Sequence, residues 1–361
     1  MLKIQIKRNL RRTLMRGHPW VYRDALEKNP TVEQAQLCQV LDSKNEALGW
    51  AMYDPHSPLA LRIMSLDAKP PNWLFFEKKF EQTFNLRKAF IKNDTDSFRL
   101  FNGEGDRLPG MICDVYGSIA VLQFDGKGPR EFWDKNKISE WILKNTPLLS
   151  VVEKVRKPTE EKILQQLGGK PVNPEIQIQE NQVRFHVDLE NGQKTGFFLD
   201  QRENRKYVQD CSHGKSVLNL FSYSGGFSVY AGLGGATQVA SCDISAGAII
   251  LANANWALNN LPPETHRGLC VDIFDFLKTD RELWDCVIVD PPSMSHSEDQ
   301  KARAQAKYIE IFALAAKKVK PQGHLFLSSC SSHISFDDFF EIINESLSES
   351  RRRGQILRVS G

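Results

Sequence analysis

Short apolar runs alternate with amphipathic stretches through the last half of the chain. Five runs of strand length predict strands at Val217–Phe221, Gln238–Asp243, Gly268–Asp272, Cys286–Asp290 and His324–Ser328. Helical spacing of apolar residues predicts helices at Ala246–Asn259, Lys301–Lys318 and Phe336–Leu347. Strands that alternate with helices form a parallel sheet with right-handed crossovers. Residues 181–361 are therefore predicted to form an α/β domain with a doubly wound sheet.

The beginning of the chain has a different pattern. Residues 1–68 carry short apolar runs separated by turn formers, which predicts a small β-barrel-like module. The consecutive prolines Pro70 and Pro71 favour extended chain and mark a linker after this module.

The middle of the chain, residues 73–180, mixes two periods. Apolar residues recur at helical spacing in Phe75–Lys92 and Glu131–Lys144, and strand-like runs lie within Leu100–Phe124. This mixture predicts a central α+β domain, and no catalytic motif stands out in it.

Composition adds little, but the distribution of charge is informative. At 361 residues, with 41% hydrophobic and 25% charged residues, the chain fits a globular protein of two or three domains. The net charge of +3 is too small to indicate a nucleic-acid-binding protein. Such a binding role is nevertheless compatible with the first 23 residues, because a basic block either covers a solvated surface or contacts polyanions. This block has no Asp or Glu and seven basic residues, Lys3, Lys7, Arg8, Arg11, Arg12, Arg16 and Arg23.

The cysteines restrict metal binding and location. Seven cysteines lie at least 16 residues apart, so the chain has no CxxC pair, and we expect no bound metal. An odd number of cysteines without a secretory leader fits the reducing cytoplasm. The sequence has no run of 18 apolar residues, so we expect no membrane span. Isolated cysteines are mostly small buried side chains, and we expect burial of Cys113, Cys211, Cys242, Cys270 and Cys286.

A glycine-containing turn follows the first strand of the α/β domain. It contains Phe221, Ser222, Tyr223, Ser224, Gly225 and Gly226. Glycines without a Cβ let the backbone approach a ligand where a strand turns into a helix. The turn lacks the GxGxxG spacing of dinucleotide sites, which argues against a nicotinamide enzyme. Taken alone, it is equally compatible with a tight turn that binds nothing.

Two aspartates after the next strands favour a nucleoside ligand. Asp243 ends the second strand, where a carboxylate can accept hydrogen bonds from both ribose hydroxyls. Asp272 ends the third strand and could face an adenine amino group, a role for which Asp275 competes. Either residue alone is more often a helix cap, but the turn and the aspartates occur in the order that a nucleoside site requires.

The fourth and fifth strands end in groups that suit chemistry on a base. Asp290 is followed by Pro291 and Pro292, which hold the loop extended, and its carboxylate could hydrogen-bond a planar base. Cys330 follows the fifth strand among serines and should lie at the ligand edge, beside the fourth strand. A thiolate there could act as a nucleophile. By position alone, a buried structural cysteine is as compatible with the pattern.

A dense polar cluster precedes the α/β domain's first strand. Gly192–Arg202 combines Lys194, Thr195 and Arg202 with two aromatic residues, a mixture that suits base stacking and phosphate contacts. The alternative is a loop that opens a helix from Leu199 to Val208. The cluster alone does not decide between these interpretations.

These segments resemble the bacterial class I S-adenosylmethionine-dependent 23S rRNA methyltransferases of the cytosine carbon-5 type. The resemblance lies in Asn191–Arg205 and Leu218–Ser228, and in the motifs Asp290–Ser293 and Ser329–Ser331. It extends to further segments that resemble the family's amino-terminal PUA module and central domain, Gly17–Tyr22 and Leu108–Gly117. It implies a Rossmann-like methyltransferase domain at 181–361, a PUA-like RNA-binding domain at 1–68 and a central domain at 73–180.

The resemblance also implies a mechanism. Cys330 would attack carbon 6 of a cytosine, so that carbon 5 can accept the methyl group, while Asp290 stabilises the base through ring nitrogen 3. S-adenosylmethionine would be held by Phe221, Ser222, Tyr223, Ser224, Gly225, Gly226, Asp243, Asp272, Asp290 and Pro291. The RNA would be contacted by Lys194, Thr195, Arg202, Arg11, Arg12, Arg16 and Trp20.

The chain departs from the family at its end. Members of the family continue with final strands that close the sheet, whereas this chain stops at Gly361. Without those strands, a sheet edge would be exposed, which would lower solubility, favour a homodimer and remove part of the substrate cleft.

Other functions remain open from the sequence. The same scaffold could methylate another atom, such as guanine nitrogen 7, in a reaction that needs no thiol. The chain could also be a non-catalytic RNA-binding protein with a retained cofactor fold. An NAD-dependent oxidoreductase comes last, because GxGxxG is absent.

Overall fold

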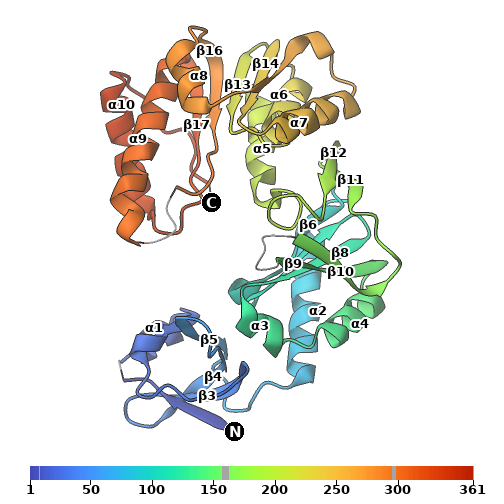
Figure 1. The fold of residues 1–361 in the computed structure, drawn as a ribbon, viewed down its shortest axis with the longest axis vertical. Helices are drawn as coiled ribbons and strands as arrows, with labels where there is room; N and C mark the ends of the chain where they lie inside the picture. Colours follow the sequence, from blue (N-terminus) through green and yellow to red (C-terminus); the bar gives the residue numbers. More distant parts are fainter. Residues whose placement is uncertain (8, 157–161, 295–297, 361) are drawn as a thin grey trace. The chain divides into compact units, whose positions relative to one another are not determined.

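The computed structural model describes residues 1–7, 9–156, 162–294 and 298–360. The chain forms two compact units (Figure 1). The first unit comprises Met1–Gln182 and Val187–Leu199, and the second comprises Val183–His186 and Asp200–Gly361. The chain therefore passes from one unit to the other three times, after Gln182, His186 and Leu199.

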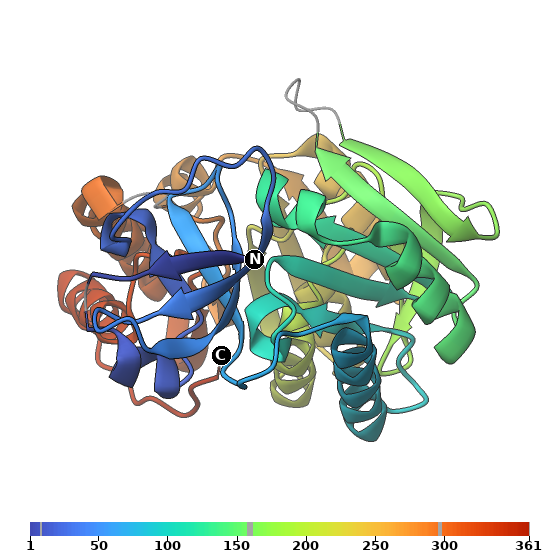
Figure 2. The same ribbon diagram turned by 90° about the horizontal axis from the view of Figure 1, so that it is seen from below.

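The amino-terminal module of the first unit is a curved five-stranded sheet in the order β1-β3-β4-β5-β2. Figure 2 shows these strands in blue, side by side. The elements are β1 (Leu2–Gln5), α1 (Arg11–Met15), β2 (Trp20–Tyr22), η1 (Arg23–Ala25), β3 (Gln36–Leu41), β4 (Ala47–Tyr53) and β5 (Leu59–Ser65). Ile4, Val40 and Leu61 are buried in one core, as expected for a small β module. The short helix α1 was not predicted.

The central part of the first unit packs helices against a second five-stranded sheet, in the order β10-β9-β8-β7-β6. Its elements are α2 (Trp73–Phe90), β6 (Ser97–Asn102), η2 (Gly103–Asp106), β7 (Met111–Tyr116), β8 (Ile119–Phe124), α3 (Lys127–Phe132), α4 (Lys135–Asn145), β9 (Ser150–Arg156) and β10 (Lys162–Gly169). The single helix predicted at Glu131–Lys144 is wrong. The helix is interrupted at Trp133. Asp134 then caps a new helix by accepting a hydrogen bond from the Lys137 amide.

A hairpin of β11 (Glu175–Glu180) and β12 (Val183–Asp188) leads toward the second unit. Two asparagine side chains of α7 (Ala246–Leu258) and its cap hold the first residues of β12. The Asn255 side chain accepts a hydrogen bond from the His186 amide at 2.7 Å. Asn259 accepts from the Arg184 amide and donates to the Arg184 carbonyl, at 2.9 and 2.8 Å. These bonds imitate strand pairing, so four residues of the hairpin belong to the second unit.

The second unit is built on a parallel five-stranded sheet in the order β15-β14-β13-β16-β17. The strands are β13 (Ser216–Leu220), β14 (Gln238–Asp243), β15 (His266–Cys270), β16 (Trp284–Val289) and β17 (Val319–Leu327). The predicted α/β class and parallel sheet are confirmed. The third strand ends at Cys270 rather than Asp272, because Asp272 caps the helix that follows.

Helices cover both faces of this sheet (Figure 1). One face packs against α8 (Ile273–Thr279), α9 (Lys301–Lys317) and α10 (Phe336–Glu349). The other face packs against α5 (Arg202–Cys211), α6 (Gly226–Leu233) and α7. Alternate strand residues such as Leu218 and Val217 face the two cores, which is why the strands read as continuous apolar runs. The short elements η3 (Leu199–Gln201), η4 (Pro263–Thr265) and η5 (Glu298–Gln300) complete the chain.

Candidate active site

The turn after β13 has a strained backbone. Phe221, Tyr223 and Gly225 have φ angles of +57°, +45° and +75°, a region that residues with side chains rarely adopt. A Cβ at Gly225 would lie 2.9 Å from the Cβ of Ala252 in α7. The dihedral angle and this close approach both require glycine here. The turn thereby carries the backbone of Ser222–Gly225 across the end of the strand.

Asp243 at the end of β14 holds this turn. One carboxylate oxygen accepts a hydrogen bond from the Tyr223 amide, and the other accepts from the Ser245 amide, each at 2.9 Å. A carboxylate has about four acceptor positions, so capacity remains for the hydroxyls of a bound ribose. Asp243 is half-buried, which leaves it accessible from the edge of the sheet.

Ser222 gives an independent sign of a ligand. Its side chain is only 6% exposed, and among the described residues its hydroxyl has no hydrogen-bond partner. A buried hydroxyl left unpaired costs about 1–3 kcal/mol, so such groups usually await a ligand or water. Beside Asp243, this hydroxyl fits the polar part of a nucleoside cofactor.

The buried side-chain amide of Asn255 holds the turn in place. The side chain of Asn255 donates to the Ser224 carbonyl at 2.9 Å, while the same side chain accepts the His186 amide of β12. Asn255 is fully buried. One residue of α7 therefore fixes both the glycine turn and the start of the hairpin.

A chain of buried hydrogen bonds runs beneath the turn. Asn219 donates to Ser228 at 2.9 Å, Ser228 pairs with Ser241 at 2.6 Å, and Ser241 pairs with His266 at 2.8 Å. Burial lowers the pKa of His266 to about 4, so this imidazole is neutral at physiological pH. The chain connects the first turn of α6 with the amino end of β15.

Asp272 lies two residues beyond β15 and is exposed. One of its carboxylate oxygens accepts hydrogen bonds from the amides of Phe274 and Asp275, at 2.9 and 3.1 Å, and so caps α8. Asp275 lies within that helix, which makes Asp272 the residue nearer the strand end.

Asp290 directly follows β16 and is oriented by two amides. The side chain of Gln201 donates to both carboxylate oxygens, at 3.4 and 3.3 Å. The side chain of Asn204 in α5 donates to the side-chain oxygen Oε1 of Gln201 at 2.7 Å. This bond fixes the orientation of the Gln201 amide, so that its NH₂ group faces Asp290. Gln201 was not among the predicted site residues. Its place in the polar cluster before α5 was the only signal for it.

Cys330 is exposed and lies beside the Asp290 loop. Its Sγ is 3.8 Å from the carbonyl oxygen of the buried Pro291. The flanking serines hold it there: Ser331 contacts Ser293 at 3.2 Å, accepts the Met294 amide at 3.1 Å and pairs with Tyr308 at 2.9 Å. Ser329 also donates to the hydroxyl of Tyr308, at 3.1 Å. The expected position beside the fourth strand is confirmed, and Tyr308 of α9 is a supporting residue that the sequence did not reveal.

Other cysteines differ from Cys330. Burial raises the pKa of Cys242 to about 12 and raises the pKa values of Cys113 and Cys286 as well, so these thiols stay protonated. Cys211 is half-buried. The expectation that Cys270 is buried is wrong: it ends the edge strand β15 and is exposed.

The polar cluster before α5 is divided between the two units. Thr195 is 1% exposed, pairs with the hydroxyl of Tyr116 at 2.7 Å and donates to Asp114 at 2.5 Å. Its own chain encloses it, which contradicts the expected contact with RNA. Lys154 donates to the Gly192 carbonyl at 2.8 Å and fixes the same loop. The sequence suggested an RNA contact because Thr195 lies in a basic loop. It could not show that the hydroxyl donates instead to Asp114, 81 residues earlier in the chain.

Lys194 and Arg202 keep accessible side chains. Lys194 is exposed, and its ammonium lies 4.5 Å from the ring centre of Phe198 in the first unit. Arg202 begins α5 in the second unit and is paired with Glu203 at 2.9 Å.

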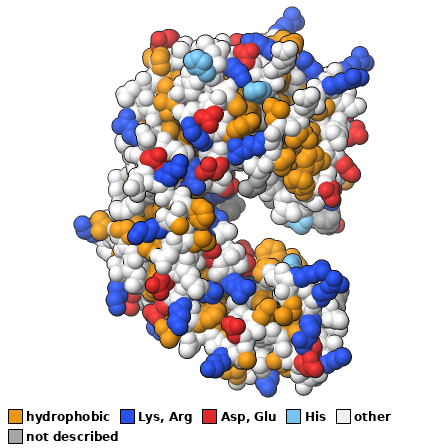
Figure 3. Space-filling view, turned by 180° about the vertical axis from the view of Figure 1, so that it is seen from behind, with side chains coloured by type: hydrophobic (Ala, Val, Ile, Leu, Met, Phe, Trp, Pro, Cys, Tyr) orange, Lys and Arg blue, Asp and Glu red, His pale blue; other side chains and the backbone are white. Residues whose placement is uncertain are grey.

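The amino-terminal candidates also differ in availability. Arg11 forms ion pairs with Asp42 and Glu46, at 3.0 and 2.9 Å, whereas Arg12 and Arg16 are exposed. Trp20 is 37% exposed. Arg8 lies outside the described residues. On the face that Figure 3 shows, Lys and Arg are scattered among acidic and hydrophobic side chains, so charge alone does not outline an RNA interface on this face.

The register of the sheet brings the second-unit candidates to one edge. Leu220 pairs with Cys242 and Val289, and Val289 pairs with Leu327, so four strands end at the same level. The glycine turn and Asp290 directly follow β13 and β16, Asp243 is the last residue of β14, and Cys330 lies three residues after the end of β17. Ligands of open α/β sheets bind outside the carboxyl ends of the strands.

Neither a metal centre nor a membrane span occurs in the described part of the chain. No cluster of three His, Cys, Asp or Glu side chains among the described residues could hold a metal ion. No helix in those ranges is long and apolar enough to cross a membrane.

Comparison with known proteins supports this geometry. The profile of the S-adenosylmethionine-dependent methyltransferase family matches residues 140–348, and that of the PUA-like domain matches residues 4–66. A ribosomal RNA large subunit methyltransferase of Deinococcus radiodurans is 33% identical over 378 residues, covering 99% of this chain and 92% of the relative. A ribosomal RNA large subunit methyltransferase I of Photobacterium profundum is 33% identical over 373 residues, covering 99% of this chain and 93% of the relative. The crystal structure of a putative methyltransferase complexed with SAH has a TM-score of 0.82 and 25% identity, covering 96% of this chain and 90% of that one.

Proposed function

The chain belongs to the S-adenosylmethionine-dependent ribosomal RNA large subunit methyltransferases of type I, and from this premise we propose that it methylates carbon 5 of a cytosine in 23S rRNA. The observation that carries the proposal is the exposed Cys330 thiol, 3.8 Å from the Pro291 carbonyl in the loop that begins with Asp290. A methyltransferase that acts on a nitrogen atom needs no thiol at this edge.

The residues of the glycine turn fit the cofactor. The hydroxyl of Ser222, unpaired among the described residues, and the remaining acceptor positions of Asp243 would hold its polar groups, and the strained backbone of Phe221–Gly226 would lie against it. When bound, S-adenosylmethionine supplies an electrophilic methyl group. Asp272 and Pro291 complete the proposed cofactor-binding set.

Carbon 5 of cytosine is a weak nucleophile, and the proposed role of Cys330 is to make it stronger. The Cys330 thiol loses its proton to solvent, Sγ bonds to carbon 6, and the electron pair of the former 5,6 double bond becomes available at carbon 5. A proton shared between the Asp290 carboxyl group and ring nitrogen 3 offsets the negative charge that this addition places on the ring, and it is given back when Sγ leaves. After methyl transfer, the proton on carbon 5 leaves to a base or water, and the bond from Sγ to carbon 6 breaks. The enzyme returns unchanged.

Ribosomal RNA as substrate requires two further properties. The target cytosine has to leave its stack to reach Cys330, because the reacting carbons of a paired base are shielded. The PUA-like module, with Arg12, Arg16 and Trp20, and the exposed Lys194 are proposed to hold the RNA through its backbone and shape. This substrate places the reaction in the cytoplasm.

The test is nucleoside mass spectrometry on unmodified 23S rRNA incubated with S-adenosylmethionine and either wild type or Cys330→Ala. We expect 5-methylcytidine with wild type and a rate lower by about 10³-fold or more with the variant, because the covalent route is closed. Cys270→Ala removes a second exposed thiol and serves as the matched control with unchanged rate.

Other outcomes separate the alternatives. A methylated purine formed equally by wild type and Cys330→Ala would overturn the covalent mechanism and favour guanine nitrogen 7. Cofactor binding without any methylated nucleoside would favour a non-catalytic RNA-binding protein.

A further inference from the structure

The edge strand β2 of the PUA-like module presents two aromatic rings on its outer face. Trp20 and Tyr22 are 37% and 52% exposed, whereas Val21 between them is 1% exposed. The buried Val21 between them faces the core, so both rings lie on the solvent side of the strand, where the pairing with β5 shifts register between Val21 and Tyr22. Within the described residues of this sheet, β2 pairs with β5 alone, which leaves its other side open. Exposed aromatic rings of this kind are suited to stacking on unpaired bases.

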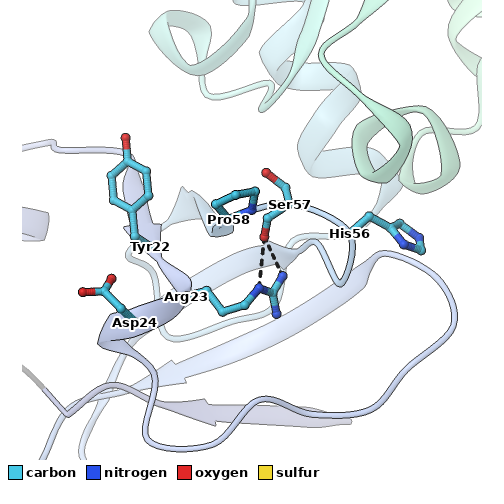
Figure 4. A pocket seen from close by; sticks show the side chains of 6 residues that line it. All are labelled: Tyr22, Arg23, Asp24, His56, Ser57 and Pro58. Atoms are coloured by element: carbon cyan, nitrogen blue, oxygen red, sulfur yellow. Dashed lines mark hydrogen bonds between the residues drawn. The ribbon is translucent and has the colours of Figure 1, made fainter. Parts of the chain in front are cut away.

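A pocket of about 540 Å³ opens beside Tyr22 (Figure 4). Its walls are Tyr22, Arg23, Asp24, His56, Ser57 and Pro58. This volume lies within the range of small-ligand sites, about 300–1,000 Å³. Figure 4 shows the ring of Tyr22 projecting away from Arg23, whose guanidinium turns toward Ser57.

The floor of this pocket is rigid. Arg23 donates to the Ser57 carbonyl from Nε and Nη2, at 3.1 and 2.6 Å, and to the Tyr53 hydroxyl at 3.1 Å. A further bond from Nη2 reaches the Asp54 carbonyl at 2.5 Å. Arg23 is thus bonded to the protein itself and links the segments that line the pocket.

The charges around the pocket favour a nucleic acid over a peptide. The exposed Arg12 and Arg16 precede the strand, and no acidic residue occurs before Asp24. Exposed cations and stacking rings within one module match a phosphate backbone with unpaired bases.

We propose that this pocket binds one unpaired nucleobase of the RNA substrate, stacked on Tyr22, with the adjacent nucleotide on Trp20. The pocket lies in the first unit and Cys330 in the second, and we assign the bound base to a nucleotide other than the methylated cytosine. The inference rests on the proposed function, since it requires an RNA substrate. It adds a site for a specific unpaired base to a module otherwise expected to hold the RNA backbone.

The test measures binding of the full chain to an unmodified 23S rRNA fragment, by filter binding at several salt concentrations. Tyr22→Ala is expected to raise Kd about 5- to 100-fold, as loss of one base stack does, and Tyr22→Phe to restore it. The salt dependence of Kd should be the same in Tyr22→Ala and wild type, because stacking releases no counterions. Arg16→Ala should reduce the slope of log K against log salt by about 1.

The control is Phe90→Ala, which removes another exposed ring, 75% accessible at the end of α2, and should leave Kd unchanged. Circular dichroism melting of each variant excludes unfolding as the cause, because Tyr22→Phe and Tyr22→Ala should melt alike. Unchanged RNA affinity in Tyr22→Ala would overturn the proposal, as would equal affinity for a fully paired RNA. Capture of an extended peptide in place of RNA would also overturn it. If Tyr22→Ala weakens RNA binding but wild type forms no methylated nucleoside, the proposed function is wrong and the proposed base-binding pocket is supported.

Discussion

The two ends of the parallel sheet are built differently, although the same strands form both. At the carboxyl end, backbone with positive φ at Phe221 and Tyr223, a buried hydroxyl unpaired within the described chain and an exposed thiol occur together. At the amino end, charges are paired: Lys320 donates to Asp285 at 2.8 Å, and Ser216 donates to the same oxygen from its amide and hydroxyl, at 2.9 and 2.7 Å.

This difference separates function from stability within one element. Asp285 and Asp290 lie at opposite ends of β16, with only four residues between them. Burial opposes ionisation of Asp285, but the bonds from Lys320 and Ser216 outweigh it and lower its pKa to about 2. The side-chain amide of Gln201 donates to both carboxylate oxygens of Asp290 and orients this carboxylate. The amino end thus uses its carboxylate in a structural ion pair, and the carboxyl end holds one at the edge where the substrate is proposed to bind.

Among substitutions that compare the two ends of the sheet, Asp290→Ala should have the largest effect. Loss of the carboxylate removes stabilisation of charge on the base, and we expect kcat to fall about 10²–10³-fold. The free energy of unfolding should change little, because Asp290 directly follows its strand and is not fully buried. Single-turnover methylation at saturating RNA measures the first quantity, and chemical denaturation measures the second. A fall in stability with full activity would reverse the comparison.

Gly225→Ala should be the next largest. The new Cβ would meet Ala252 at 2.9 Å with φ at +75°, and we expect roughly 2–4 kcal/mol lower stability, with weaker binding of S-adenosylmethionine. Gly214→Ala at the amino end is a matched control, because Gly214 has φ at +69° but a Cβ there would meet no atom of the described residues within 4 Å. Urea denaturation and calorimetric titration compare the two variants. Equal losses would show that the dihedral angle alone, and not the approach of α7, requires glycine.

His266 should make stability depend on pH. Its pKa is about 4 in the folded protein and 6.5 in the unfolded chain, so between these values only the unfolded chain binds the proton. The free energy of unfolding should therefore fall as the pH falls from about 7 to about 4, by at most roughly 3 kcal/mol. Denaturation curves across this range measure the slope, and His266→Gln should reduce it. An identical slope in the variant would contradict this assignment.

Asp285→Asn should have the smallest effect. Losing a partly exposed ion pair while keeping an acceptor for the Ser216 amide should cost about 1 kcal/mol of stability or less. The value of kcat should stay within about twofold of wild type. Parallel denaturation and methylation assays test both statements. A strong loss of methylation at full stability would mean that the amino end also contributes to catalysis.

The strand ends of the second unit could be predicted from the sequence because each is a local pattern. β14 covers Gln238–Asp243, the same residues as predicted, and Asp290 and Cys330 follow β16 and β17 as expected. An apolar run followed by polar residues is sufficient to locate the carboxyl edge of a parallel sheet.

Contacts between distant segments could not be predicted. Asn255 holds His186 from 69 residues away, and Thr195 is buried by Asp114 from 81 residues away. From the sequence alone, a polar side chain of this kind is a candidate for binding a ligand. Only the fold shows that its hydrogen-bond partner lies within the protein. The prediction that Cys270 is buried was wrong for the opposite reason. Its apolar neighbours suggest burial, but it lies on an edge strand and is exposed.

The three passages of the chain between its units have a consequence for dividing the protein. A gene split after Gln182 would leave Val187–Leu199, with the buried Thr195, on the wrong fragment. A split after Leu199 would instead deprive Asn255 and Asn259 of the strand that they hold. No single cut yields two intact halves. Complementation of separately expressed fragments should therefore succeed only where overlapping pieces both carry residues 183–199.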